Sequence, residues 1–219
     1  CRYEGMTPEK IINKINDLFP DSIVTTDVGQ NQLWTTQYIR MDGKRQFLTS
    51  GGLGTMGYGL PAAIGASIGN PGNPVICISG DGGAQMNIQE LATAHALETP
   101  VILCIFNNTY LGNVKQMQKM FYNKRYSSTC LRYSRSCNRQ CRIDGTCTGR
   151  DYVPDFVKLA ESYGCTGIRV ENEAQMDEAF KRAAENTKSV TLIEFMLDCE
   201  YDVYPMVPGG AALSDMMFG

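Results

Sequence analysis

The sequence has very little of several features on which common functions depend. Histidine occurs once, as His95, with no evident nucleophile partner, which argues against a Ser-His-Asp mechanism. Apolar runs of about 18 residues are absent, so the sequence predicts no membrane span. The first residues, CRYEGMTPEK, lack a basic segment followed by an apolar core, so we expect no secretory signal. Because the chain starts with Cys1 and not with methionine, we expect it to be a piece of a longer protein.

The composition is that of an ordinary globular protein. Hydrophobic residues make up 43% of the 219 residues and charged residues 20%, which fits a chain that folds around an apolar core. We expect one domain over residues 1–219, with a C-terminal tail at about 198–219. The nine cysteines are an odd number and several lie in apolar runs, which is typical of a protein of the reducing cytoplasm.

Short apolar runs alternate with segments that have the pattern of helices. Thr7 and Pro8, for example, are typical of a helix start, and apolar residues at helical spacing follow them. This alternation predicts an α/β fold with a doubly wound, mainly parallel six-stranded sheet and helices on both faces. The expected strands cover residues 22–26, 46–50, 74–79, 101–106, 166–170 and 190–196. The expected helices cover about 8–19, 59–68, 89–98, 112–122, 154–162 and 173–185.

The most informative motif is Gly80-Asp81-Gly82, which follows the expected strand 74–79. Asn107-Asn108 follows the next expected strand, and Asn108 stands 27 positions after Asp81. A helix between the two strands, with Asn87 and Glu90 at the spacing of a capping box, completes a strand-helix-strand unit. The carboxyl ends of parallel strands meet at one edge of a sheet, where open α/β sheets bind ligands. A carboxylate and an amide oxygen at that edge predict a site for a magnesium-bound diphosphate.

The glycines around Asp81 fit the same interpretation. Gly80 and Gly82 allow the backbone to approach a ligand, and the amides of Gly83 and Ala84 could face a diphosphate. An ordinary strand-to-helix turn with an Asx cap is the alternative, because short glycine motifs often occur by chance. The paired asparagines at this spacing favour the metal site over that alternative.

Gly80-Asp81-Gly82 with Asn107-Asn108 resembles the thiamine-diphosphate motif, and longer segments narrow the likeness. Nearly the whole chain, apart from one insertion, is similar to the C-terminal, thiamine-diphosphate-binding domain of the large catalytic subunit of acetolactate (acetohydroxyacid) synthase. The segments that carry this resemblance are DVGQNQLW from Asp27, TSGGLGTMGYGLPAAIGA from Thr49, GDGGAQMNIQELAT from Gly80, DFVKLAESYG from Asp155 and VYPMVPGGAAL from Val203.

The resemblance implies roles for individual residues. The family's metal is Mg²⁺, held by the side chains of Asp81 and Asn108 and by the main-chain carbonyl of Tyr110. Met56 matches the apolar side chain that bends the cofactor during catalysis, although a flexible methionine is also a common core residue. The cofactor contacts that the family implies are Gln30, Gly54, Met56, Gly80, Asp81, Gly82, Gly83, Ala84, Met86, Asn108, Tyr110, Leu111 and Gly112.

The resemblance also implies a reaction and partners. Pyruvate would lose carbon dioxide on thiamine diphosphate, and the remaining fragment would add to a second 2-oxoacid in branched-chain amino-acid biosynthesis. In this family FAD binds mainly in a middle domain, and an N-terminal pyrimidine-binding domain of a neighbouring subunit supplies the activating glutamate. We therefore expect a homodimer or larger assembly, a small regulatory subunit as a further partner, and little or no turnover by this chain alone.

Some features leave alternatives open. Asn113 and Met117 stand where the family often has methionine and tryptophan, and because that tryptophan helps to choose the second 2-oxoacid, the preference of this chain is undecided. Gly209 stands where a second proline is usual in the tail, which would loosen the segment that covers the site. One alternative function is the thiamine-binding subunit of a 2-oxoacid:ferredoxin oxidoreductase, which can carry four cluster cysteines. A non-catalytic module that retains the fold is the other.

Residues at about 126–150 form a cysteine- and arginine-rich insertion. Its cysteines could ligate zinc or an iron–sulfur cluster, although the usual close C-x-x-C pair is missing. A disulfide is a further alternative, and a solvated surface loop with free thiols is the interpretation that we favour. The arginines lack an aromatic platform or a binding motif, so we expect no nucleic-acid partner. The four cysteines are Cys130, Cys137, Cys141 and Cys147.

Overall fold

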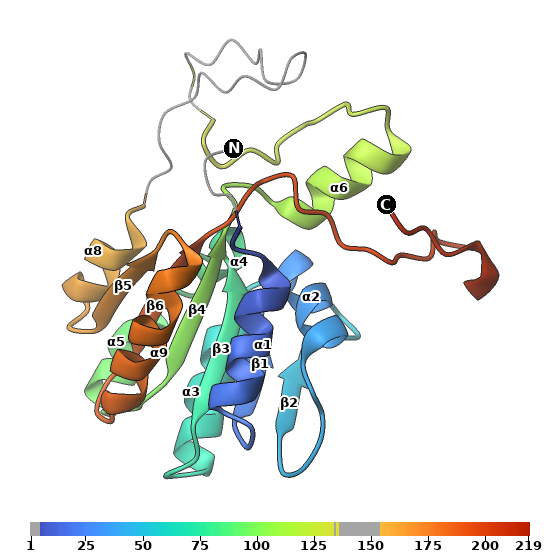
Figure 1. The fold of residues 1–219 in the computed structure, drawn as a ribbon. Helices are drawn as coiled ribbons and strands as arrows, with labels where there is room; N and C mark the ends of the chain where they lie inside the picture. The colour runs from blue at the N-terminus through green and yellow to red at the C-terminus, as the bar shows by residue number, and fades with distance from the viewer. Residues whose placement is uncertain (1–4, 134, 136–153) are drawn as a thin grey trace.

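A parallel β-sheet forms the centre of the protein (Figure 1). The computed structural model describes residues 5–133, 135 and 154–219. Within them six strands pair in the order β2-β1-β3-β4-β6-β5, and each pair is parallel. Because each strand lies within about one residue of its predicted range, the predicted doubly wound six-stranded α/β sheet is confirmed. The strands are β1 (Ile23–Thr26), β2 (Gln46–Thr49), β3 (Val75–Gly80), β4 (Ile102–Asn107), β5 (Thr166–Val170) and β6 (Thr191–Met196).

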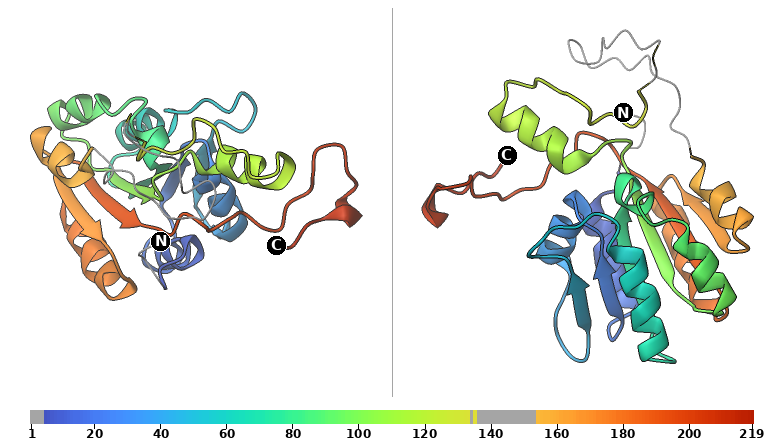
Figure 2. Two further views of the ribbon diagram at one scale, coloured as in Figure 1. Left: turned by 90° about the horizontal axis from the view of Figure 1, so that it is seen from above. Right: turned by 180° about the vertical axis from the view of Figure 1, so that it is seen from behind.

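Helices cover both faces of this sheet, as Figure 2 shows. They are, on one face, α1 (Pro8–Leu18), α2 (Gln30–Tyr38) and α9 (Met176–Glu185) and, on the other, α3 (Gly59–Gly69), α5 (Glu90–Ala96) and α8 (Phe156–Ser162). Successive residues of a strand point to opposite faces. In β3, Ile76 and Ile78 pack in the apolar cluster of the first face, whereas Cys77 packs in that of the second. Burial on both faces explains the continuous apolar sequence of the central strands.

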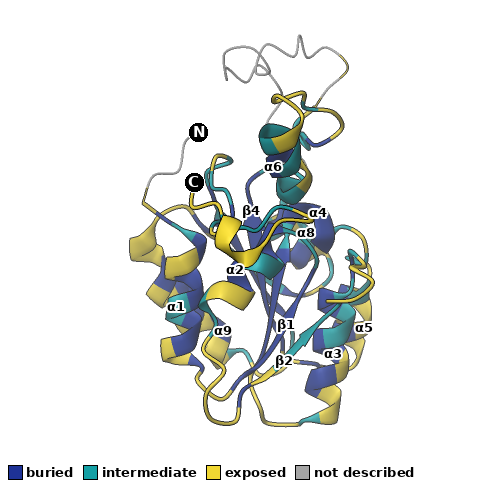
Figure 3. Ribbon diagram, turned by 90° about the vertical axis from the view of Figure 1, so that its right-hand side faces the viewer, coloured by how far each residue is buried: buried dark blue, intermediate teal, exposed yellow. Residues whose placement is uncertain are grey.

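Helix α6 (Gly112–Phe121) stands over the edge at which the strands end, and the C-terminal tail runs beside it (Figures 1 and 3). Among the described residues, none of the helices has both the length and the apolar character that a membrane crossing requires. The remaining short elements are α4 (Asp81–Ala84), η1 (Glu173–Gln175) and η2 (Leu213–Asp215).

Two predicted helix starts have different outcomes. Thr7 caps α1 as predicted, because its Oγ1 accepts a hydrogen bond from the Lys10 amide at 3.2 Å. The predicted capping box of Asn87 and Glu90 is wrong. The Asn87 side chain instead donates to the Gly57 carbonyl at 2.8 Å, and α5 begins without a side-chain cap. The Asn87 side chain therefore makes a tertiary hydrogen bond to Gly57 and does not form the local helix cap that the sequence pattern predicted.

The strand order changes direction at β1. Strands β2 and β3 both follow β1 in the sequence, yet they lie on opposite sides of it. In open α/β sheets the loops diverge at such a point and leave a crevice beyond the carboxyl ends of the strands, where ligands bind. The residues that follow β1, β3 and β4 at this carboxyl edge are Asp27, Asp81 and Asn108.

Candidate metal and cofactor site

The ends of β3 and β4 bring Asp81 and Asn108 to the same edge of the sheet. Gly80 pairs with Phe106 in register, so Asp81 and Asn108 both lie just beyond a matched pair. Both residues are buried, with relative exposures of 1% and 7%. The backbone of Thr109, next to Asn108, lies close enough to the Asp81 carboxyl to lower its pKa. The predicted acid and the predicted amide therefore share one environment.

Asp81 is a buried acid with one unsatisfied oxygen. Its Oδ1 accepts a hydrogen bond from the Gly82 amide at 2.9 Å, but within the described part of the chain Oδ2 has no hydrogen-bond partner. Burial raises the pKa of Asp81 to about 8, although the nearby backbone amides of Gly82 and Thr109 oppose the rise. A buried carboxylate oxygen without a donor is costly unless a cation accompanies it. The surroundings of Asp81 therefore fit a divalent metal ion.

Two asparagines hold the turn that follows β4. The Asn107 Oδ1 accepts a hydrogen bond from the Thr109 amide at 3.0 Å, and the Asn108 Oδ1 accepts one from the Tyr110 amide at 3.1 Å. Thr109 has a φ of +61°, a left-handed value that is rare for a β-branched residue. The side-chain hydrogen bonds therefore hold a strained backbone, which places Asn108 and Tyr110 together at the carboxyl edge.

Two glycines show which segments meet at this edge. A Cβ on Gly82 would lie 2.5 Å from Leu111 Cδ2 and 3.7 Å from Met56 Cε, so three separate segments are in contact there. A Cβ on Gly112 would overlap the Gln30 side chain and lie 2.9 Å from Asn108 Nδ2. The predicted site residues that the fold brings together are Gln30, Met56, Asp81, Gly82, Asn108, Tyr110, Leu111 and Gly112.

Other predicted cofactor contacts have different surroundings. Gly54 stands in an exposed turn, and no described atom outside its neighbours lies within 4 Å of its Cβ position. Ala84 packs in the apolar cluster of the face that α3 covers, so its side chain points into the core. Met86 is 52% exposed and lies beside Gly57, in the loop that carries Met56. Gly80 ends β3, and a Cβ at this position would lie 3.4 Å from Asn31 Oδ1.

Asp27 is a residue of this edge that the sequence prediction missed. Its carboxylate oxygens accept hydrogen bonds from the amides of Val28, Gly57 and Gly59 at 2.9–3.1 Å. A Cβ on Gly83 would overlap the same carboxylate. Asp27 therefore fastens the loop that carries Met56 against the ends of β1 and α4. The available signal was an acid directly after a strand, with a glycine-rich loop about 30 positions later.

Gln30 belongs to a chain of amides that connects the carboxyl edge with the C-terminal tail. Its Oε1 accepts a hydrogen bond from Asn108 Nδ2 at 3.2 Å, and its Nε2 donates to Gln116 Oε1 at 2.9 Å. Gln116, fully buried on α6, exchanges two hydrogen bonds of 2.9 Å with the backbone of Val203. The Gln30 side chain therefore contacts protein groups on both sides of the site.

Ion pairs fasten the same tail to α6. Lys115 donates to Glu200 at 2.7 Å, and Lys119 donates to Asp202 at 2.6 Å. The hydrogen bond to Asp202 raises the pKa of Lys119. Burial favours a higher pKa for Glu200, but the hydrogen bond and charge of Lys115 outweigh it and lower that pKa overall. The tail is thus held over the carboxyl edge by backbone and charged contacts together.

The start of the insertion also touches the site. Cys130 forms an isolated bridge with Tyr110, and the Leu111 amide donates to the Thr129 carbonyl at 2.8 Å. Among the described residues, no group of three His, Cys, Asp or Glu side chains could hold a metal, and Asp81 would depend on amide and carbonyl oxygens instead. The alternatives of a cysteine-ligated metal and of a disulfide involve residues outside the described part of the chain, namely Cys137, Cys141 and Cys147.

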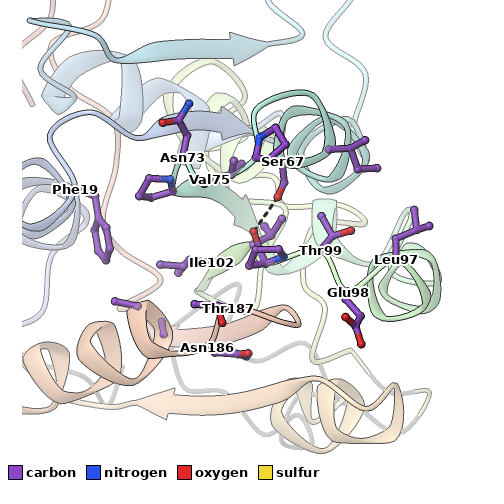
Figure 4. Close-up of a pocket in the computed structure, with 18 residues that line it drawn as sticks. Phe19, Ser67, Asn73, Val75, Leu97, Glu98, Thr99, Ile102, Asn186 and Thr187 are labelled. Atoms are coloured by element: carbon purple, nitrogen blue, oxygen red, sulfur yellow. Dashed lines mark hydrogen bonds between the residues drawn. The ribbon is translucent and has the colours of Figure 1, made fainter.

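A cavity of about 640 Å³ lies at the opposite edge of the sheet, where β3 and β4 begin (Figure 4). Apolar side chains line most of it, among them Phe19, Val75 and Ile102. In its wall, the Ser67 hydroxyl donates to the Pro100 carbonyl at 3.1 Å. The residues that line this cavity include no predicted ligand of the metal or the cofactor, so it is not the candidate site.

Comparison with known families gives a match over most of the chain. Residues 27–195 match the family described as "Thiamine pyrophosphate enzyme, C-terminal TPP binding domain". The matched range begins at Asp27 and includes the whole cluster of site residues around Asp81 and Asn108.

Individual relatives share one description. The chain is 42% identical over 216 residues to "Probable acetolactate synthase large subunit" of Methanococcus aeolicus, covering 96% of this chain and 33% of the relative. It is 40% identical over 209 residues to "Acetolactate synthase" of Mycobacterium bovis, covering 95% and 31%. It is 38% identical over 216 residues to "Acetolactate synthase isozyme 3 large subunit" of Escherichia coli, covering 97% and 34%. The chain therefore spans about a third of the length of the curated relatives it matches.

Proposed function

This chain belongs to the thiamine pyrophosphate enzymes, as their C-terminal TPP binding domain, and we propose that it is the cofactor-binding third of an acetolactate synthase large subunit. The relatives that support this proposal carry the name acetolactate synthase and align with nearly the whole chain. The proposed reaction joins a fragment of pyruvate, formed by loss of carbon dioxide, to a second 2-oxoacid. Bound thiamine diphosphate would supply the carbanion stabilisation that this chemistry needs.

The observation that supports the metal site most strongly is the unpartnered Oδ2 of Asp81. This oxygen is buried, and within the described part of the chain it has no hydrogen-bond donor. Mg²⁺ prefers oxygen ligands and is commonly held by one or two carboxylates together with phosphate oxygens. We infer that Asp81, the Asn108 side chain and the Tyr110 carbonyl hold Mg²⁺, which in turn would bind the diphosphate.

The surrounding residues would bind and orient the cofactor. Gly82 leaves room for the backbone next to Leu111 and Met56, since any Cβ at Gly82 would come too close to Leu111. Met56 would support the bent cofactor with its apolar side chain. Asp27 would keep Met56 in place, because its carboxylate holds the amides of Gly57 and Gly59. The tail that Gln116 holds would help to exclude water.

The remaining two thirds of such an enzyme would complete the site. We infer that a pyrimidine-binding domain and an FAD-binding domain belong to the same polypeptide, that the assembly is a homodimer or larger, and that a small regulatory subunit is a further partner. We therefore expect no steady acetolactate production from pyruvate by the 219-residue chain alone. Steady production by the purified chain, at a rate comparable to that of a complete enzyme, would contradict this division of the site.

Calorimetric titration of thiamine diphosphate into this chain tests the metal site. We expect Mg²⁺ to raise the affinity at least about tenfold, because the ion links the carboxylate to the diphosphate. The Asp81→Ala variant should lose that magnesium-dependent gain. The matched control is Asp17→Ala, which removes an exposed carboxylate on α1 and should keep the gain. Equal affinity with and without Mg²⁺, or a gain that survives Asp81→Ala, would refute the proposed site.

A further inference from the structure

Glu194 is a buried acid whose role the proposed metal site leaves unexplained. It lies on β6, is 2% exposed, and pairs in register with Arg169 of the edge strand β5. Its Oε2 accepts a hydrogen bond from Arg169 Nε at 2.8 Å. Its Oε1 accepts one from Asn107 Nδ2 at 2.7 Å. Both oxygens of this carboxylate are therefore occupied by donors that come from opposite sides.

Asn107 transmits this contact to the turn that follows β4. With its Nδ2 held by Glu194, the Asn107 side chain directs its Oδ1 toward the Thr109 amide, at 3.0 Å. Thr109 is the residue with φ +61°, and the residues on either side of it are Asn108 and Tyr110. A threonine in this conformation persists only where its surroundings stabilise it. The hydrogen bond that the Thr109 amide donates to Asn107 Oδ1 is one such contact, and Glu194 orients this acceptor.

We propose that Glu194 is a positioning residue, which acts through Asn107 to hold the left-handed Thr109 turn that presents Asn108 and Tyr110 to the metal. This inference rests on the proposed function only for the identity of the ligand. The shape of the turn is a property of the chain itself and can be measured without any metal. In this arrangement the first asparagine of the pair orients the backbone, and the second is the ligand.

The hydrogen bonds require a carboxylate at position 194. A glutamine has the same shape, but its amide offers one acceptor and one donor, whereas Asn107 Nδ2 and Arg169 Nε both donate. If the glutamine NH₂ faced Arg169, two donors would oppose each other. If it faced Asn107, the Asn107 amide would have to flip and turn its own NH₂ toward the Thr109 amide. Either outcome removes a hydrogen bond, and the second loosens the turn directly.

Amide hydrogen exchange, measured residue by residue on the metal-free chain, tests this role. In Glu194→Gln we expect the exchange of the Thr109 amide to accelerate about tenfold, as the loss of about one hydrogen bond predicts. Exchange in β1, on the far side of β3, should keep its wild-type rates. The Mg²⁺ affinity in the presence of thiamine diphosphate should fall about fivefold to tenfold in the same variant.

Two further variants separate positioning from general damage. Asp155→Asn is the matched control, because Asp155 contacts Arg169 at 2.8 Å and caps α8 but does not contact Glu194. Asparagine is also a good cap, so exchange at Thr109 should stay within about twofold of wild type. The double variant Glu194→Gln with Arg169→Leu removes the opposing donor, so the glutamine oxygen can face Asn107. We expect this variant to recover most of the lost protection and affinity.

Specific results would overturn the inference. Unchanged exchange at Thr109 in Glu194→Gln would show that Glu194 does not hold the turn. Faster exchange spread evenly over β1, β3 and β4 would show a general loss of stability instead. A double variant as impaired as the single one would contradict the orientation argument. If the wild-type chain bound no Mg²⁺ at all, the proposed function would fail, and the exchange at Thr109 would still decide what Glu194 does to the turn.

Discussion

Asp27 and Asp81 occupy matching positions in the fold and have opposite surroundings. Each directly follows a strand, β1 and β3 are neighbours, and each residue is 1% exposed. Asp27 accepts hydrogen bonds from the amides of Val28, Gly57 and Gly59. Asp81 has an oxygen with no partner among the described residues. The comparison teaches that burial of an acid at a strand end does not by itself indicate a ligand site, and that the unmet hydrogen-bonding capacity of Asp81 is what separates these two acids.

The two acids therefore have different physical roles. The donors around Asp27 come from the chain itself, so that carboxylate is satisfied in the folded protein without a ligand. At Asp81 the effect of burial is the largest one, and it raises the pKa to about 8. The ionised form of Asp81 thus costs free energy in the metal-free fold, and a bound cation would remove that cost. Asp27 thus has a structural role, and the proposed role of Asp81 is to bind the ligand.

The largest effect that would sharpen this comparison is expected from Asp27→Ala. The substitution leaves several buried amides without an acceptor, including those of Gly57 and Gly59, and each costs about 1–3 kcal/mol. We expect a loss of roughly 4 kcal/mol in the free energy of unfolding, measured by urea denaturation. Asp17→Ala, which removes an exposed ion pair, should cost less than about 1 kcal/mol. A loss at position 27 as small as at position 17 would contradict the structural role.

A smaller effect of opposite sign is expected from Asp81→Asn without metal. The folded-state pKa of Asp81 is about 8, above its ordinary value of 3.8, so the folded form binds the proton more tightly than the unfolded form. The contribution of Asp81 to the stability of the wild type is therefore most favourable below about pH 4 and is lost as the pH rises toward 8. The asparagine variant lacks this loss. Its advantage should grow by on the order of 3 kcal/mol between pH 4 and 9.

Urea denaturation of both proteins in metal-free buffer across this pH range gives the measurement. Other ionisable groups are the same in both proteins, so the difference in the free energy of unfolding isolates Asp81. Saturating Mg²⁺ with thiamine diphosphate should reverse the order at pH 8 by stabilising only the wild type. If the difference in the free energy of unfolding between the two proteins does not change with pH, burial does not raise the pKa of Asp81 as its surroundings indicate.

The smallest effects are expected from adding a single methyl group beside each acid, in the variants Gly83→Ala and Gly82→Ala. Gly83→Ala would push a Cβ into the Asp27 carboxylate, which the amides of the Met56 loop hold in place. We expect this to cost about 2 kcal/mol of stability, measured by thermal or urea denaturation. Gly82→Ala would meet the end of the Leu111 side chain, which can move, so the loss should stay below about 1 kcal/mol. Gly82→Ala should instead weaken cofactor binding. Equal destabilisation by the two variants would contradict the claim that the Asp27 carboxylate is held more rigidly than the Leu111 side chain.

The strands of this protein could be predicted closely because each is a short apolar run with polar or glycine residues at its ends. The run before Gly80 and the run before Asn107 are examples, and both strands lie where they were expected. Asp81 and Asn108 could be predicted as neighbours for the same reason, since consecutive parallel strands end at the same edge. Local patterns were sufficient wherever the deciding contact lay within a strand or between neighbouring strands.

The partners of Asp27, Asn87 and Glu194 could not be predicted in this way. Gly57 lies 30 positions from both Asp27 and Asn87, and Asn107 lies 87 positions from Glu194. Each contact joins a loop or strand end to an element that is distant in the sequence. Asn87 shows the consequence, since its side chain bonds to the Gly57 carbonyl and does not form the predicted local cap.

The sequence by itself determined the succession of strands and helices along the chain, the edge at which the polar residues gather, and the acid and amide that stand there. These follow from the period of apolar residues and the position of glycines, which act over a few residues. Only the tertiary structure decided which of two equally buried acids is satisfied by the chain and which is left unmet. That outcome depends on where backbone amides from distant loops come to rest, because hydrogen bonds require contact within about 3 Å and sequence spacing does not report such contact.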